Sequence, residues 1–276
     1  MMRQTSGTKT EECSATPVSA FAESAGAETG EFFQRFSLQF RVQHIFLFAS
    51  TITLIITGVP LWCMGRPEYS WSQAVVSTFG SIESIRYLHR AGAGVLILVS
   101  IYHLFYTVFT KEGRREFIEL LPRQKDVIDV TINSLYFLGL VKYRPSFGRF
   151  TYYEKFDYWA VYWGCVIMIG TGLVLWFPEV TAKYVPWFTY ELAAEVHADE
   201  AILAALALFI WHFYNVHFNP SRFPGTLMWW HGKISREEMM HDHVLEYYKK
   251  VLAQTKSKRI GDCRLPTADC KSKIEN

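Results

Sequence analysis

Six of the nine histidines lie in long apolar segments or at their ends: His44, His89, His103, His197, His212 and His217. An ionisable side chain is costly inside a bilayer, so a histidine in such a segment indicates a function. Neutral imidazole is a good ligand for transition metals and for haem iron. These residues therefore predict a metal or haem centre within a membrane.

The spacing of four of these histidines is more informative than their number. His89 and His103 are 14 residues apart, which on a helix returns to within about 40° of the same face and separates them by about 21 Å. His197 and His212 are 15 residues apart, giving a rotation of about 60° and a rise of about 22 Å. Two facing helices would thus offer a histidine pair at each of two depths, which suits bis-imidazole ligation of an iron porphyrin.

Other interpretations of the same residues are weaker. A single membrane histidine is often a core residue bonded to a carbonyl, but two matched pairs favour haem. A di-iron or zinc site would need carboxylate or cysteine ligands gathered at one depth. These helices also contain the glycines Gly58, Gly92, Gly94 and Gly172. They would leave space for a flat macrocycle, or would simply allow the helices to pack closely. Arg86 and Arg90 flank His89 and are candidates to bind haem propionates or to lie at the interface.

The elements that would hold these histidines are four apolar segments of about 20 residues, the length needed to span a bilayer. They cover residues 42–63, 87–109, 156–177 and 196–218. We therefore expect an all-α fold, an integral membrane four-helix bundle. Residues 127–141 are also apolar, but the segment is short and carries Asp129 and Asn133, so we interpret it as an interfacial helix or part of a long loop.

A weak internal repeat links the first and third spans. TITLIITGVPLW, which ends at Trp62, resembles VIMIGTGLVLWFP, which ends at Pro178, and each is followed by a span that bears two histidines. The pattern predicts two helix pairs side by side, with sites in the core of the bundle.

Basic residues are concentrated between the second and third spans, at Lys111, Arg114, Arg115, Arg123, Lys125, Lys142, Arg144 and Arg149. By the positive-inside rule this loop is cytoplasmic, and so are both termini. We divide the chain into a flexible tail of residues 1–34, a membrane domain of residues 35–220 and a cytoplasmic segment of residues 221–276. The histidines of that last segment, His231, His241 and His243, are expected on the solvated surface.

Composition excludes several classes of protein. The net charge of +2 offers no basic excess for binding nucleic acid. The five cysteines form neither a C-x-x-C pair nor a C-x-x-C-H motif, so a zinc ribbon, a disulfide framework and covalently attached haem are not expected. Any haem would therefore be bound without covalent attachment, as b-type haem is.

The motifs QHIFLF, YLHRAGAG, EVHADEA, FIWHFYNVH and WWHGKISREEMMHDHVLEYY, in this order, resemble the cytochrome b subunits of membrane-bound formate dehydrogenases and related oxidoreductases. RYLHRAGAGVLILVSIYHLF also resembles the second helix of the cytochrome b of bc-type quinol oxidoreductases. Both resemblances imply that His89 and His197 hold one haem. For the other haem, the first implies His44 with His212 and the second implies His103 with His212. A third haem on His44 and His217 stays open.

The resemblance implies a subunit that transfers electrons between menaquinone or ubiquinone and a periplasmic iron–sulfur or multihaem cytochrome subunit, in the cytoplasmic membrane of a bacterium or archaeon. Glu154 and Asp157, at the start of the third span, are candidates for quinone protonation; Asp199 and Glu200 are alternatives at the opposite side. A haem-binding anchor or assembly subunit without its own quinone site is the second interpretation. A transporter that uses the histidines as a proton relay, without haem, is the third.

Overall fold

The computed structural model describes residues 32–64, 71–219, 223 and 225–262. In this part of the chain, four helices are long and apolar enough to cross a membrane. They are α2 (Leu38–Cys63), α4 (Ile82–Phe109), α7 (Tyr152–Trp176) and α9 (Phe188–Leu206), the last continued by η2 (Ala207–His212) and η3 (Tyr214–Phe218). The predicted all-α four-helix membrane bundle is thus confirmed, and the chain is a multi-pass membrane protein.

The long helices begin several residues before the apolar segments that predicted them, and polar caps start three of them, α2, α4 and α7. The N–H of Phe40 donates to Ser37 Oγ (3.4 Å) at the start of α2, and the N–H of Ser84 donates to Ser81 Oγ (3.1 Å) at the start of α4. At the start of α7, Thr151 and Glu154 form a capping box in which the Glu154 carboxylate accepts from the N–H of Thr151 (2.8 Å). A hydropathy pattern does not register these polar first turns.

Short elements connect and cap the bundle. They are β1 (Phe32–Gln34), α3 (Trp71–Thr78), α5 (Lys111–Leu120), α6 (Gln124–Phe137), α8 (Pro178–Tyr184), α10 (Met228–His231), β2 (Lys233–Ser235), α11 (Arg236–Asp242) and α12 (Val244–Asp262). The apolar segment of residues 127–141 is therefore mostly the short helix α6. Its Asp126 is bound by Lys155 of α7 (2.8 Å), and its Asn133 donates to Tyr152 (2.7 Å).

The spans are arranged with apolar side chains outward and polar ones inward. On α2, the buried polar residues Gln43, Ser50 and Thr57 recur every seven positions and so share one face. Each hydroxyl on this face donates to a backbone carbonyl of its own helix, such as Thr57 Oγ1 to Thr53 O (2.7 Å). Large apolar side chains such as Leu98 and Ile210 are exposed, as expected for surfaces that face lipid.

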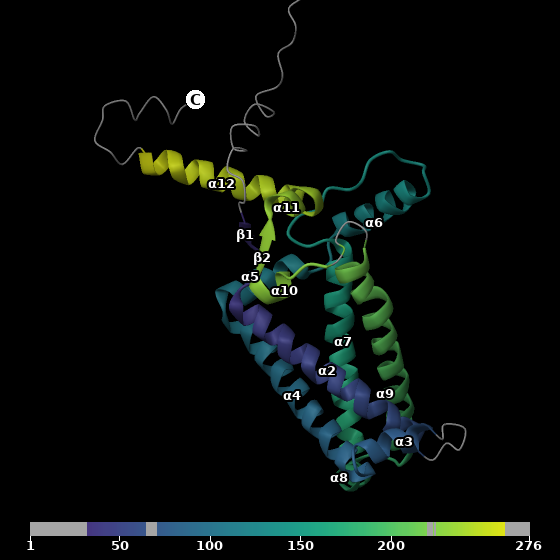
Figure 1. The fold of residues 1–276 in the computed structure, drawn as a ribbon. Coiled ribbons are helices and arrows are strands. Elements are labelled where there is room, and N and C mark those ends of the chain that lie inside the picture. The colour runs from purple at the N-terminus through teal and green to yellow at the C-terminus, as the bar shows by residue number, and fades with distance from the viewer. Residues whose placement is uncertain (1–31, 65–70, 220–222, 224, 263–276) are drawn as a thin grey trace, which may run out of the picture.

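The four spans associate as two pairs. α2 packs mainly against α4, and α7 packs mainly against α9. The two pairs lie at an angle to each other, with α3 and α8 at one end of the bundle and α5, α6 and the C-terminal elements at the other (Figure 1). This arrangement agrees with the internal repeat seen in the sequence.

The fourth span contains two π-helical turns, η2 and η3, in which the backbone N–H bonds to the fifth preceding carbonyl. Each π turn holds one extra residue without an additional turn of helix. The 15-residue spacing from His197 to His212 then acts like a spacing of about 14 residues, and His212 is rotated by about 100° from the position that a regular α-helix would give it. The angle of about 60° expected for this pair is therefore corrected to about 40°, as for His89 and His103.

The C-terminal elements close one end of the bundle. β2 pairs antiparallel with β1, Phe33 opposite Ile234, and a small core of Phe33, Met228, Ile234, Met239 and Tyr247 joins the strands to α11 and α12. The predicted boundary of the flexible tail at residue 34 is therefore wrong for residues 32–34, which form β1. Residues 1–31, the rest of that tail, lie outside the described residues.

A buried ion-pair network ties this C-terminal segment to the bundle. Glu246 of α12 binds Arg35, just before α2, at 2.7 Å and Arg149, just before α7, at 2.8 Å. Arg149 also binds Glu116 of α5 (2.7 Å). Burial raises the pKa of Glu246, but the positive charges of Arg35 and Arg149 outweigh it and hold this pKa below its ordinary value of 4.5.

Acid is expected to release this segment. Because the pKa of Glu246 is lowered in the folded state, its stabilising contribution is present above about pH 4.5 and is lost as the pH falls further. Glu246→Gln should show the same release at neutral pH, since removing one partner of a buried ion pair costs about 3–5 kcal/mol. Hydrogen exchange of the α12 amides measures both effects. Unchanged protection in Glu246→Gln at pH 7 would contradict this role.

Candidate functional site

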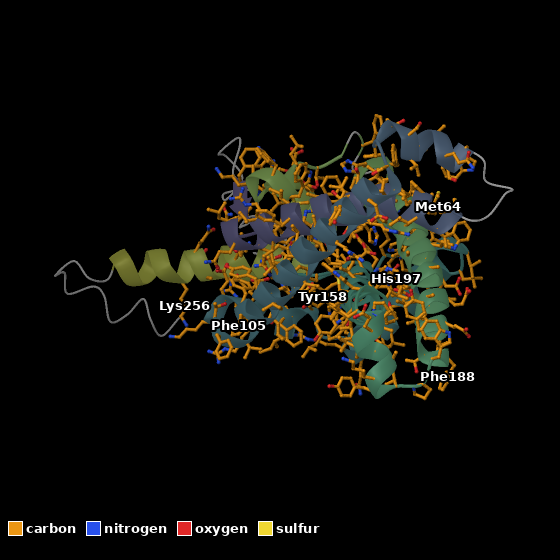
Figure 2. The ribbon with its side chains drawn as sticks, turned by 90° about the horizontal axis from the view of Figure 1, so that it is seen from below. Met64, Phe105, Tyr158, Phe188, His197 and Lys256 are labelled. Atoms are coloured by element: carbon orange, nitrogen blue, oxygen red, sulfur yellow. The ribbon has the colours of Figure 1, made fainter. Side chains whose placement is uncertain are left out.

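At the α3 and α8 end of the bundle, His89 of α4 and His197 of α9 are held in matching ways. His89 Nδ1 lies 2.9 Å from Thr57 Oγ1 of α2, and His197 Nδ1 lies 2.8 Å from Thr171 Oγ1 of α7. Figure 2 shows His197 in the interior of the bundle, while Phe188 lies on its periphery.

These contacts fix which ring nitrogen carries the hydrogen. The hydroxyl of Thr57 donates to Thr53 O (2.7 Å), and that of Thr171 donates to Ile167 O (2.7 Å). Each hydroxyl oxygen can then only accept from the histidine, so Nδ1 is protonated and Nε2 bears the lone pair. A histidine whose Nδ1–H is anchored and whose Nε2 is free is oriented as metal-ligating histidines are.

Glycine at two positions leaves the room that these rings occupy. A Cβ atom on Gly58 would stand 3.3 Å from Cε1 of His89, and a Cβ atom on Gly172 would stand 3.3 Å from Cε1 of His197. The same Thr-Gly dipeptide thus serves each ring, with the threonine as acceptor and the glycine as space. The dipeptide is visible in both copies of the sequence repeat, so this support could have been predicted.

A second group of histidines lies near the other end of the bundle. His212 Nδ1 faces Asp157 Oδ2 at 3.3 Å, which leaves its Nε2 with the lone pair. The ring of His44, on α2, lies beside that of His212 with 6.5 Å between centroids and 36° between planes. The buried Nδ1 of His44 has no hydrogen-bond partner within the described residues.

His103 is held differently, because both of its nitrogens have partners. Gln43 uses its Nε2 to donate to Gln39 O (3.2 Å), so its Oε1 accepts from His103 Nδ1–H (2.8 Å). His103 Nε2 then accepts from the hydroxyl of Tyr158 (3.0 Å). No lone pair remains on this imidazole for a metal.

The repeat relates these two environments. Thr57 and Thr171 are equivalent positions of the two repeats. Gln43 and Asp157 have the same separation in sequence, and so do His44 and Tyr158, so these residues are also equivalent. Gln43 and Asp157 each hold a histidine of the following span by Nδ1. The halves differ at the next residue, where His44 approaches His212 and Tyr158 binds His103.

His217 does not join either group. Its ring lies beside Phe213, with 5.8 Å between centroids, and its Nδ1 occupies the space that a Cβ on Gly225, beyond the end of η3, would need. His44 lies beside His212 instead. The geometry therefore does not bring His44 and His217 together as a third ligand pair.

The charged candidates are placed as follows. The guanidinium of Arg90 stacks over Trp176 (5.6 Å), and Arg86 pairs with Glu83 (2.7 Å). Glu154 caps α7 and binds Arg35 (3.4 Å). Asp157 contacts His212. Of the two alternatives on α9, Asp199 is exposed. Glu200 lies against Gly164 of α7, because a Cβ atom added to Gly164 would stand 3.1 Å from Glu200 Oε1.

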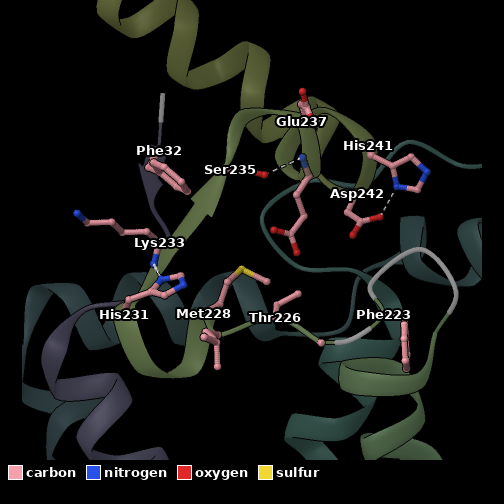
Figure 3. A pocket seen from close by; sticks show the side chains of 13 residues that line it. Phe32, Phe223, Thr226, Met228, His231, Lys233, Ser235, Glu237, His241 and Asp242 are labelled. Atoms are coloured by element: carbon pink, nitrogen blue, oxygen red, sulfur yellow. Dashed lines mark hydrogen bonds and ion pairs between the residues drawn. The ribbon is translucent and has the colours of Figure 1, made fainter. Parts of the chain in front are cut away.

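The described residues contain no second cluster of ligand side chains outside these histidines. No group of three or more His, Cys, Asp or Glu side chains there could hold a metal ion. An open cavity of about 460 Å³ lies outside the spans, between α10, β2 and α11 (Figure 3). Its His231 accepts from the N–H of Lys233, and its His241 is bound to Asp242 (2.7 Å). The candidate metal or haem ligands are therefore the histidines of the spans, and not those of this cavity.

Neither a comparison with protein-family models nor a search of curated proteins finds a match for this chain. The arrangement of the membrane histidines and their partners is accordingly the basis for a functional assignment.

Proposed function

We propose that this chain is a membrane cytochrome with two b-type haems, which transfers electrons between the quinone pool and a partner redox subunit. His89 and His197 would hold one haem, and His44 and His212 the other. The end of the bundle with α5, α6 and the C-terminal segment would face the cytoplasm, because the basic residues of the second loop gather there.

The matched pair of Thr-His contacts is the observation that carries this proposal. Thr57 with His89, and Thr171 with His197, come from different helix pairs and yet give the same tautomer, with Nε2 free. Neither Nε2 is hydrogen-bonded within the described residues, so each ring offers the unoccupied nitrogen that an iron ligand requires.

The second pair fits the same use. The rings of His44 and His212 lie side by side with 6.5 Å between their centroids. These two side chains would hold the iron of the second haem. Nδ1 of His44 has no hydrogen-bond partner within the described residues, so this ring lacks the anchor that His89 and His197 have. His103, with both nitrogens bonded, favours the formate-dehydrogenase type of ligand pattern over the bc type.

A bound b-type haem supplies reversible one-electron carriage. The chain's own residues orient the ligands and set their charge: Asp157 places a carboxylate on Nδ1 of His212, which increases the basicity of that ligand. Thr57 and Thr171 give His89 and His197 a neutral partner instead. The two ligand pairs thus differ in their electrostatic surroundings, as two sites in an electron-transfer chain would.

Quinone chemistry needs a proton-exchanging group as well. Asp157 and Glu154 lie on one face of α7, about one turn apart, at the end where His212 lies. Asp157 contacts His212 directly, and Glu154 is closer to the aqueous end. We assign quinone-linked proton exchange to this end of the bundle.

The deciding experiment combines haem stoichiometry with quinol reduction. The purified chain, expressed in a haem-replete host, is assayed by pyridine haemochrome and protein quantitation, and then mixed with menaquinol or ubiquinol. Two b-type haems that quinol reduces support the proposal. Two haems that quinol does not reduce favour an anchor or assembly subunit. A folded helical protein without haem rules the proposal out.

Gly172→Val is expected to reduce haem binding at the level of His197 by at least about fivefold, because overpacking a tight contact costs about 1–3 kcal/mol. The added atoms would enter the space beside Cε1 of His197. Gly170→Val is the matched control on the same helix, since a Cβ there meets nothing within 4 Å. Equal haem contents in the two variants would show that haem binding by His197 does not depend on the space left by Gly172.

A further inference from the structure

His243 lies in the C-terminal segment that we expected to be solvated, but its side chain is fully buried at the junction of α11 and α12. Its Nδ1 stands 2.8 Å from the carbonyl oxygen of Gly148, in the loop before α7. Because a carbonyl only accepts, Nδ1 carries a hydrogen. In the neutral ring, the lone pair is therefore on Nε2.

That lone pair faces a carboxylate. Nε2 of His243 stands 3.9 Å from Oε1 of Glu154 and makes no hydrogen bond within the described residues. A bare nitrogen and an ionised carboxylate both only accept, so they repel each other until a proton lies between them. With a proton on Nε2, a closure of about 1 Å would give an ordinary charge-assisted hydrogen bond to the Glu154 carboxylate.

The surrounding charges decide when this proton is bound. Burial lowers the pKa of His243, the carboxylates of Glu154 and Asp242 raise it, and Arg35 lowers it, for a net value below 6.5. Arg35 also binds Glu154 at 3.4 Å, and it is shared with Glu246 at 2.7 Å. The lowered pKa keeps the His243 ring mostly neutral at pH 7, and added negative charge nearby would favour its protonation.

Such a charge would arise close by. Glu154 lies one turn before Asp157 on α7, and Asp157 contacts the proposed haem ligand His212. We propose that Glu154 and His243 together bind one exchangeable proton at this end of the bundle and take it up when negative charge arises near His212. This coupling rests on the proposed function. Only a proton moves, from the aqueous side to Nε2, and no electron crosses the pair.

Nitrogen NMR of the full chain, labelled with ¹⁵N-histidine in detergent, tests the pair without haem. His243→Asn assigns the signal and keeps a donor for Gly148, and Glu154→Gln removes the charge while a glutamine still completes the capping box. We expect Glu154→Gln to lower the proton affinity of His243 at least about tenfold, as losing an opposite charge within about 4–6 Å does. His231→Asn, at an exposed histidine of α10 whose Nδ1 accepts from the N–H of Lys233, should change nothing. An unaltered His243 titration in Glu154→Gln overturns the pair.

The coupling is tested on the haem-loaded chain by repeating the titration after reduction with dithionite. A higher proton affinity of His243 in the reduced protein supports it, and an unchanged affinity overturns it. If the chain binds no haem, the proposed function and this coupling both fail, while the titration of the haem-free chain still decides whether Glu154 and His243 share a proton. The two failures are therefore distinguishable.

Discussion

Alanine in place of His44 is expected to remove about half of the haem, whereas glutamine in place of His103 should leave both haems bound. His44 lies beside His212 with ring centres 6.5 Å apart, while both nitrogens of His103 are bonded to Gln43 and Tyr158. Glutamine at position 103 offers one donor and one acceptor, so it can satisfy these two partners without an imidazole. Haem per chain, measured by pyridine haemochrome, gives the comparison.

The reverse result would assign the ligands differently. Loss of haem in His103→Gln with full haem in His44→Ala would favour the bc-type pattern, in which His103 pairs with His212. It would also require the rings of His103 and Tyr158 to separate, since a metal cannot bind a nitrogen that already accepts a hydrogen bond. Thermal unfolding of both variants shows whether haem was lost through the ligand or through the fold.

Alanine in place of His197 is expected to remove the other haem and to leave the His44 and His212 pair occupied. His197 comes from α9 and His89 from α4, so losing either ligand should empty the same level. Haem content should therefore fall by about half in each single variant, and no further in the double variant. Redox titration of the remaining haem should give one midpoint potential in place of two.

His217→Ala is the matched control for this series. His217 lies in the same span as His212 but packs against Gly225 and Phe213. Full haem content in His217→Ala supports two haems per chain. A loss there would instead support a third haem, and an additive loss in His89→Ala with His197→Ala would show that these two residues do not share one centre.

Much of the architecture was predictable because its signals are local. Hydropathy located the four spans, and the spacing of His89, His103, His197 and His212 predicted two depths in the bundle. The Thr-Gly dipeptides at Thr57 and Thr171 were also visible in the repeat, but their role depends on which ring each hydroxyl meets. That contact joins separate helices, and spacing along one helix does not reveal it.

Other features depend on tertiary contacts or on backbone detail. The π turns rotate His212, and no residue type in this stretch marks them. The occupied nitrogens of His103 follow from Gln43 of α2 and Tyr158 of α7, which come from two helices other than its own. His243 looked like a surface residue because its neighbours in sequence are charged, yet docking of the C-terminal segment against Gly148 and Glu154 buries it.

The packing of the spans as two pairs has a thermodynamic consequence. α2 holds α4 and α7 holds α9, with much less contact between the pairs. His44 and His212, like His89 and His197, come from opposite pairs. A group that bridges His44 and His212, or His89 and His197, therefore joins the two helix pairs. Its binding free energy then contributes to the free energy of association of the α2–α4 pair with the α7–α9 pair. Cofactor binding and association of the two helix pairs would then be a single linked equilibrium.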